Sequence, residues 1–190
     1  MKEIATYTPA YDSETSGFCA WFTGLSGSGK TATAEKLQTA IEARGRRVTL
    51  LDGDVVREHL SKGLGFTRED RDTNVLRIGY VASRIAYHGG VALCSLIGPY
   101  RDTRDRVREL FAENNFLEIY LATPLDVCEA RDPKGHYQKV REGSLRSFTG
   151  IDDPYEPPIA AEITLDTSNA TVNQNVQIIM NEIISRGFME

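Results

Sequence analysis

A glycine-rich segment near the start of the sequence gives its clearest chemical signal. The segment reads GLSGSGKT and fits the pattern GxxxxGK[ST] at every position. Glycines let such a loop turn its backbone N–H groups toward phosphates, the lysine reaches the terminal phosphates and the last hydroxyl binds Mg²⁺. The motif, called here the phosphate loop, consists of Gly24, Leu25, Ser26, Gly27, Ser28, Gly29, Lys30 and Thr31. It predicts a nucleoside triphosphate site in which Lys30 is a catalytic cation and Thr31 a metal ligand; the alternative is a chance glycine-serine turn.

A second segment, LDGDVVR, places two aspartates around a glycine. A carboxylate beside a phosphate loop can support the Mg²⁺ shell or accept a proton from an attacking hydroxyl. Asp52 and Asp54 are therefore candidate site residues. The same residues also suit an Asp-Gly turn in which Asp54 caps a helix, and residue types alone leave both interpretations open.

A third segment, GFTREDRDTNVLR, puts Arg71 and Asn74 three positions apart, so that both lie on one face of a helix. Such a face could present a guanidinium fork and an amide to one anionic ligand. Acidic residues alternate with the arginines, however, and spacing alone favours an ordinary solvated face.

These segments must be positioned by regular elements, and the apolar pattern alternates between short runs and longer helical periods. It predicts strands at Phe18–Thr23, Val48–Leu51, Val91–Ile97, Phe116–Leu121 and Ile163–Leu165, and helices at Lys30–Arg44, Arg68–His88, Thr103–Glu113 and Thr171–Arg186. This alternation is typical of a three-layer α/β/α fold with a mainly parallel five-stranded sheet. Ligands of such sheets bind beyond the carboxyl ends of the strands, where the motifs fall.

The overall composition limits the partners. The net charge of −5 gives no electrostatic reason to bind nucleic acid or an anionic membrane. The cysteines Cys19, Cys94 and Cys128 lie in apolar stretches without metal-ligand spacing, so we expect buried free thiols. The N-terminal residues 1–16 are polar and lack the apolar core of a signal peptide, and no run is long enough to span a membrane. We therefore expect a soluble, cytoplasmic protein.

In their order along the chain, GLSGSGKT, LDGDVVR, GFTREDRDTNVLR, IGPYR, RDPKGHY and FTGIDDPYEPP resemble the adenylyl-sulfate (APS) kinase family of P-loop kinases. The resemblance implies a kinase domain at 17–190 after an N-terminal extension at 1–16, with a mobile lid at about 130–149. It also implies Mg²⁺-dependent transfer of the γ-phosphate of ATP to the 3′-hydroxyl of APS. The resemblance also implies a homodimer, and fusion to or association with ATP sulfurylase is an open alternative.

The resemblance assigns roles by position. Asp54 would activate the 3′-hydroxyl, Phe66 and Phe148 would sandwich the adenine of APS, and Arg131 would lie near the adenine of ATP. The further APS contacts that it implies are Asp52, Arg57, Arg71, Asn74, Ile97, Gly98, Lys134 and Thr149, and Thr33 joins the phosphate loop in binding ATP. Without the resemblance, Phe66 would be interpreted as a core residue and Phe148 as a loop anchor.

One departure from the family pattern concerns Gly98, where a serine commonly precedes the PYR triplet. That serine has been linked to a phosphoenzyme, so its absence favours direct in-line transfer. Two rivals remain: a P-loop kinase for a nucleoside, gluconate or shikimate, and a catalytically silent nucleotide-sensing module attached to an ATP sulfurylase. The intact Lys30, Thr31 and Asp54 argue against the silent module.

Overall fold

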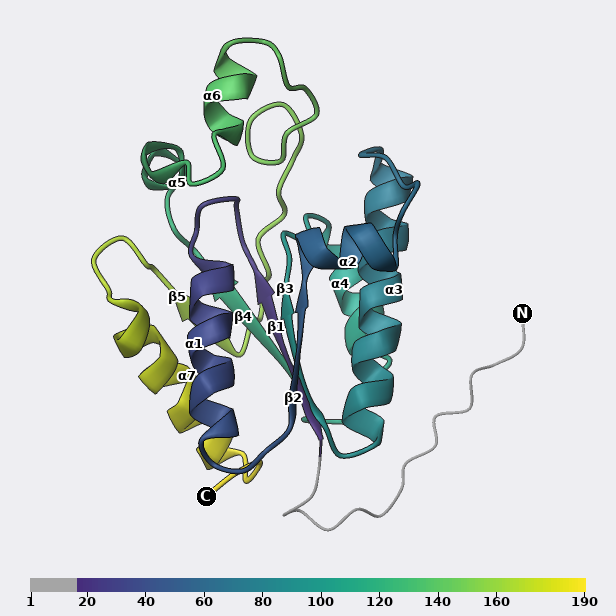
Figure 1. Cartoon of the computed structure of the whole chain (residues 1–190), viewed down its shortest axis with the longest axis vertical. Coiled ribbons are helices and arrows are strands. Elements are labelled where there is room, and N and C mark those ends of the chain that lie inside the picture. The colour runs from purple at the N-terminus through teal and green to yellow at the C-terminus, as the bar shows by residue number, and fades with distance from the viewer. Residues whose placement is uncertain (1–16) are drawn as a thin grey trace.

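A five-stranded, wholly parallel sheet forms the centre of the computed structural model, which describes residues 17–190 (Figure 1). Its strands are β1 (Phe18–Thr23), β2 (Val48–Asp52), β3 (Val91–Ser95), β4 (Phe116–Leu121) and β5 (Ile163–Leu165), in the order β2-β3-β1-β4-β5. All five predicted strands are confirmed. The predicted extension at 1–16 lies outside the described residues.

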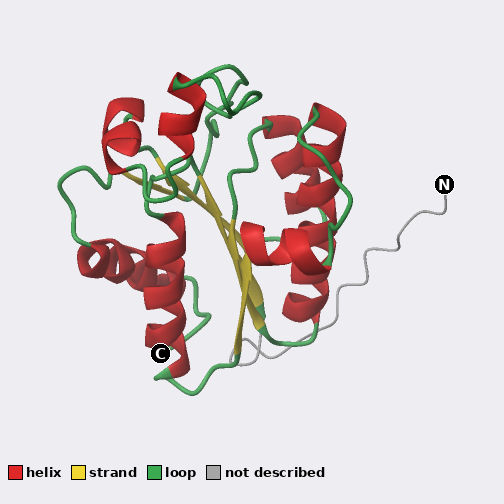
Figure 2. Cartoon of the chain, turned by 45° about the horizontal axis from the view of Figure 1, so that its top comes forward, coloured by secondary structure: helices red, strands yellow, loops and turns green. Residues whose placement is uncertain are grey.

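Helices cover both faces of the sheet, as the three-layer prediction requires (Figures 1 and 2). They are α1 (Lys30–Glu42), α2 (Gly53–His59), α3 (Arg68–Tyr87), α4 (Arg101–Arg108), α5 (Leu125–Arg131), α6 (His136–Arg141) and α7 (Val172–Ser185). α1 and α7 lie against one face and α3 and α4 against the other. The side chains of β1 alternate between the two layers: Phe18, Ala20 and Phe22 pack under α1 and α7, whereas Cys19 and Trp21 pack under α3.

Two predicted elements have wrong bounds for which the structure gives a physical reason, and the other predicted elements agree or differ by at most two residues at an end. β3 ends at Ser95 instead of Ile97, because the chain leaves the sheet toward Gly98, whose φ is +51°, and Pro99, which has no N–H for a ladder. α4 covers Arg101–Arg108 instead of Thr103–Glu113. It gives way to turns that bring the Phe111 ring within 5.1 Å of the Phe116 ring, so an aromatic contact replaces the last helical turn.

Short helices were missed in regions predicted as turn or lid. α2, of which only Val56 is buried, starts directly after β2. α5 and α6 run into and through the lid, whose predicted range 130–149 is therefore partly helical. Gly135 (φ 64°) precedes α6, and the Asp132 carboxylate accepts from the backbone N–H groups of Tyr137 and Gln138 in its first turn. Helices this short give no readable 3.6-residue period.

The interior agrees with the expectations on cysteine. Cys19, Cys94 and Cys128 are buried free thiols. Among residues 17–190, no helix combines the length and apolarity needed to cross a bilayer.

Candidate active site

The phosphate loop lies between the carboxyl end of β1 and the first turn of α1, beneath α5 (Figure 1). Its glycines are required by close approach. At Gly24 (φ 146°) a Cβ atom would lie 2.7 Å from the Leu121 carbonyl oxygen, and at Gly27 (φ 76°) it would lie 2.7 Å from that of Cys128. Any side chain would therefore displace the loop from β4 or α5, which explains the glycine spacing that the motif shows.

Lys30 is folded back over the loop. It is 8% exposed, and its Nζ donates to the carbonyl oxygens of Gly24 (3.0 Å) and Leu25 (2.7 Å). Burial lowers the pKa of Lys30 to about 8, because an ammonium loses hydration in the interior. The Lys30 side chain is thus a poorly hydrated cation beside the backbone amides of the loop. A phosphate bound there would be attracted to its positive charge. Thr33 lies a turn inside α1, where its hydroxyl donates to the Gly29 carbonyl at 2.8 Å.

Three side-chain oxygens lie close together where β2 and β3 end beside α1. The Thr31 hydroxyl donates to Asp52 Oδ2 at 2.9 Å and lies 3.2 Å from Ser95 Oγ. Asp52 Oδ1 accepts from the Asp54 N–H at 3.0 Å and so caps α2. Asp52, and not Asp54, is therefore the cap. A hydroxyl and a carboxylate beside a phosphate site fit Mg²⁺, which is usually held by one or two protein oxygens together with phosphates and water.

Asp54 stands in the first turn of α2 with its carboxylate exposed, and it forms an ion pair with Lys134 of the lid. The contact joins two candidates that are far apart in the sequence. Asp52, Asp54 and Lys134 also all act electrostatically on Lys30. The structure thus brings the proposed base, the lid lysine and the phosphate-loop lysine into one charged region.

A second cluster connects α2, α3 and the segment after the lid. The Arg57 guanidinium lies 4.5 Å above the Phe66 ring. Arg71 is buried and donates to the Phe66 carbonyl (2.9 Å), to Thr149 Oγ1 (2.8 Å) and to Asp153 Oδ2 (3.1 Å). The solvated-face interpretation of Arg71 is therefore wrong.

Asn74, one turn further along α3, is also buried, and its Oδ1 has no hydrogen-bond partner among the described residues. An unsatisfied buried acceptor costs about 1–3 kcal/mol and indicates a place for a ligand donor.

The two candidate adenine-binding rings differ in burial. Phe66 is 59% exposed, so it is not a core residue. Phe148 is 9% exposed and meets Tyr137 edge-on at 5.0 Å in a small cluster under the lid, as a loop anchor would. Arg71 donates hydrogen bonds to the Phe66 carbonyl and to Thr149, which follows Phe148 in the chain. It therefore links the two segments that carry the rings.

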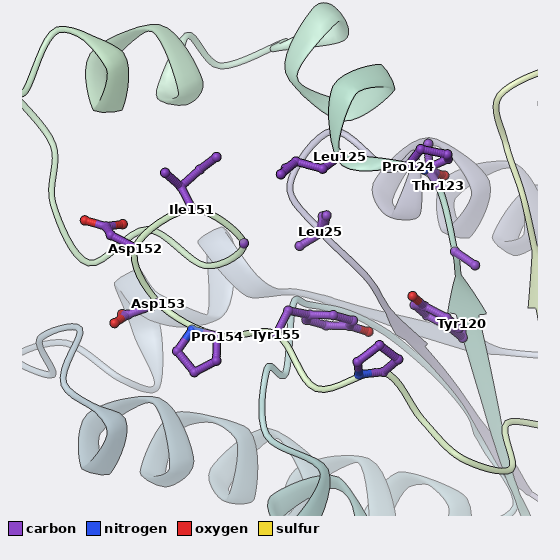
Figure 3. Close-up of a pocket in the computed structure, with 13 residues that line it drawn as sticks. Leu25, Tyr120, Thr123, Pro124, Leu125, Ile151, Asp152, Asp153, Pro154 and Tyr155 are labelled. Atoms are coloured by element: carbon purple, nitrogen blue, oxygen red, sulfur yellow. The ribbon is translucent and has the colours of Figure 1, made fainter.

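The predicted lid segment contacts the phosphate loop and the residues after β5. Tyr137 OH donates to the Ser26 carbonyl at 2.9 Å, and Arg131 donates to Thr167 Oγ1 (2.8 Å) and to the Thr167 carbonyl (2.6 Å) beyond β5. A cavity of about 530 Å³ opens between Leu25, Leu125 and the segment around Tyr155 (Figure 3). Except for Leu25, none of the predicted site residues lines it, and sequence analysis missed it.

The loop after β3 is held by hydrogen bonds from β1 and α4. The Ile97 carbonyl accepts from Thr23 Oγ1 (2.6 Å), and the Gly98 carbonyl accepts from the buried Arg104 (2.6 Å). A Cβ atom at Gly98 would make ordinary contacts, 3.8 Å from Trp21 Nε1 among them, and the Trp21 N–H has no partner among residues 17–190.

This geometry predicts different stabilities for two substitutions at Gly98. Gly98→Ala should destabilise the protein by about 1 kcal/mol, because a Cβ is strained at φ +51°. Gly98→Ser carries the same strain, but its hydroxyl can accept from Trp21, and we expect it to recover most of the loss. Urea unfolding followed by the fluorescence of Trp21, the chain's single tryptophan, measures both. Equal stabilities for the two variants would contradict the prediction.

Comparison with known proteins decides the family. The family model described as adenylylsulphate kinase matches residues 16–166. The curated adenylyl-sulfate kinase of Synechococcus sp. (strain JA-3-3Ab) is 48% identical over 174 residues, which cover 92% of this chain and 98% of that protein. The chain belongs to the adenylyl-sulfate kinase family. The resemblance found in the sequence is thereby confirmed.

Solved adenylyl-sulfate kinases share the fold. The Mycobacterium tuberculosis APS kinase CysC, in complex with AMPPNP and APS, is 36% identical with a TM-score of 0.85, over 89% of this chain and 98% of that one. A hexameric APS kinase from Thiobacillus denitrificans is 38% identical with a TM-score of 0.73, over 94% of this chain and 31% of that one.

Three residues that contact the candidate site of this adenylyl-sulfate kinase family member were not predicted from the sequence. Ser95 ends an apolar run and reaches Thr31 only because β3 lies next to β1. Arg104 forms a buried ion pair with Glu118 (2.7 Å), and Tyr137 lies in the lid. The strand order would have pointed to Ser95, and the RDPKGHY segment ends at Tyr137, whereas no sequence signal marks Arg104.

Proposed function

We propose that this chain is an adenylyl-sulfate kinase that transfers the γ-phosphate of ATP to the 3′-hydroxyl of APS, giving 3′-phosphoadenylyl sulfate and ADP. The observation that supports it most is the match to curated adenylyl-sulfate kinases over nearly the full length of both chains. We place the reaction in the cytoplasm, where free thiols persist. A homodimer is our proposal for its assembly, to be tested by sedimentation.

In the proposed mechanism the phosphate loop binds ATP, and the Lys30 ammonium and loop N–H groups stabilise the charge of the transferring group. Thr31 and Asp52 would hold Mg²⁺, which neutralises phosphate charge when bound. Asp54 accepts or steers the proton of the attacking hydroxyl. Transfer is direct, because Gly98 offers no hydroxyl where the family's serine would stand.

APS binding is assigned to the cluster around Arg71. Arg57 and the exposed Phe66 form its open side. Asn74 offers a ligand donor its Oδ1 atom, which has no hydrogen-bond partner within residues 17–190. Lys134, now paired with Asp54, approaches from the lid. Ile97, Gly98, Phe148 and Thr149 complete the site. On the other side of the phosphates, Arg131 would meet the adenine of ATP.

The decisive experiment is ADP release measured with APS, adenosine, gluconate and shikimate as acceptors. Of the four acceptors, we expect turnover only with APS, and we expect a product that carries phosphate on the 3′-oxygen. Faster turnover with any of the other acceptors would overturn the proposal. Absence of turnover with all of them, despite ATP binding, would favour a silent nucleotide-binding module.

Replacing Phe66 and Phe148 by alanine should distinguish a role in APS binding from a role in packing. Phe66→Ala should weaken APS binding by ~1–3 kcal/mol, the scale of one base–aromatic stack, without lowering the melting temperature, because the ring is exposed. Phe148→Ala should weaken APS binding and also lower the melting temperature, since it empties the cluster with Tyr137. Calorimetric titration and thermal unfolding measure both. A fall in stability for Phe66→Ala would restore the core interpretation.

The affinity for ATP should fall as the pH rises above about 8. The pKa of Lys30 is lowered to about 8 in the free protein, and bound phosphates favour the charged ammonium and raise that pKa. Binding therefore takes up a proton above pH 8, and Kd should rise by up to about tenfold per pH unit there. Titrations from pH 7.5 to about 9.5 test this. Lys30→Arg keeps its charge and should show no such rise.

A further inference from the structure

Ser95 completes a hydrogen-bond network around the Thr31 hydroxyl. It is the last residue of β3, pairs in register with Asp52 on β2 and is 3% exposed. Its Oγ lies 3.2 Å from Thr31 Oγ1, which donates to Asp52 Oδ2 at 2.9 Å. Three side chains from β2, β3 and α1 therefore meet in one network.

The proton count of this network gives Ser95 a definite role. A hydroxyl has one proton and two lone pairs. The Thr31 proton goes to Asp52, so Ser95 must be the donor between the two hydroxyls. The Ser95 proton then occupies one lone pair of Thr31 Oγ1. Only one lone pair remains, and its direction is fixed by the other two hydrogen bonds.

We propose that Ser95 is a positioning residue for the metal of the Mg²⁺·ATP complex, acting through Thr31. Mg²⁺ demands near-ideal octahedral geometry, so a ligand oxygen whose free lone pair is already oriented binds it better than a freely rotating one. Partners that orient a ligand in this way typically change metal affinity by about 10–100-fold when removed. The inference rests on the proposed use of ATP, but not on the identity of the acceptor.

The test measures the metal directly. Mn²⁺ binding to the complex of the protein with AMPPNP is followed by electron paramagnetic resonance, without APS. Ser95→Ala removes the donor, and we expect Mn²⁺ affinity to fall by about tenfold. Ser95→Thr keeps a hydroxyl and should restore it. AMPPNP affinity in the presence of EDTA should not change in either variant.

A matched control is Ser83→Ala. Ser83 is equally buried but donates within α3 to the Tyr80 carbonyl at 2.8 Å, so its loss should leave Mn²⁺ affinity unchanged. Ser95→Cys keeps the shape of the side chain but is only a weak donor, and it replaces Ser95→Ala if that variant does not fold.

The possible outcomes are distinct. Unchanged Mn²⁺ affinity in a folded Ser95 variant overturns the inference, even if the wild type phosphorylates APS as proposed. Equal losses of Mn²⁺ and metal-free AMPPNP affinity would also overturn it, because Ser95 would then hold the loop and not the metal. Weaker Mn²⁺ binding with unchanged metal-free AMPPNP affinity supports it, whichever acceptor the wild type uses.

Discussion

Replacing Lys30 by alanine should lower kcat by about 10³-fold or more while leaving the fold intact. Loss of a phosphate-directed cation costs several kcal/mol of transition-state stabilisation. The Lys30 ammonium is buried, and its two hydrogen bonds go to carbonyl oxygens of the phosphate loop itself. Its removal therefore breaks no hydrogen bond to another element of the described chain. Circular dichroism and steady-state kinetics on the purified variant measure fold and rate.

Lys36→Ala is the matched control for Lys30→Ala. Lys36 lies on the same helix, α1, but is exposed, so its loss should change neither kcat nor stability. A folded Lys30→Ala variant with near-normal kcat would show that this loop does not serve phosphoryl transfer.

The sequence predicted the layers of the fold because the three central strands, β1, β3 and β4, are buried along nearly their whole length. Such strands appear as mainly apolar runs. The partly exposed edge strands β2 and β5 were found as well. The strand order was not available, because it depends on which crossovers the chain makes. The short helices also escaped prediction: α2 buries only Val56, and α6 buries only Tyr137. Their positions are set by capping carboxylates and by contacts with the phosphate loop, which leave no periodic pattern.

Within the candidate site, residue spacing predicted the motifs that lie in one segment of the chain. It did not predict hydrogen bonds between residues far apart in the sequence. The phosphate loop is complete within one segment, so its geometry follows from its residues. Arg71 seemed a solvated arginine because its partners, Thr149 and Asp153, are far along the chain. The resemblance to a family marked Arg71 where spacing could not. Neither spacing nor the family resemblance marked Ser95. It comes close to Thr31 only because β3 lies next to β1 in the sheet.

The second large effect is expected at Asp54. Asp54→Asn should lower kcat by about 10²–10⁴-fold, the usual contribution of a positioned base, with little change in ATP affinity. The amide keeps the shape and can hydrogen-bond, but it cannot accept the hydroxyl proton. Asp52→Asn should affect chemistry less. Asp52 accepts from Thr31 and caps α2. The Asp52→Asn variant should therefore chiefly require a higher Mg²⁺ concentration to reach its full rate. Measuring kcat at saturating Mg²⁺ and ATP, with ATP Kd for both variants, separates the roles.

The ion pair between Asp54 and Lys134 needs its own control, because Asp54→Asn also removes this contact with the lid. Lys134→Gln breaks the same pair and leaves the carboxylate in place. If Asp54 acts as the base, Lys134→Gln should mainly raise KM for APS, whereas Asp54→Asn should mainly lower kcat. Equal effects of both variants on kcat would mean that the carboxylate only anchors the lid. A larger kcat loss for Asp52→Asn at saturating Mg²⁺ would transfer the role of base from Asp54 to Asp52.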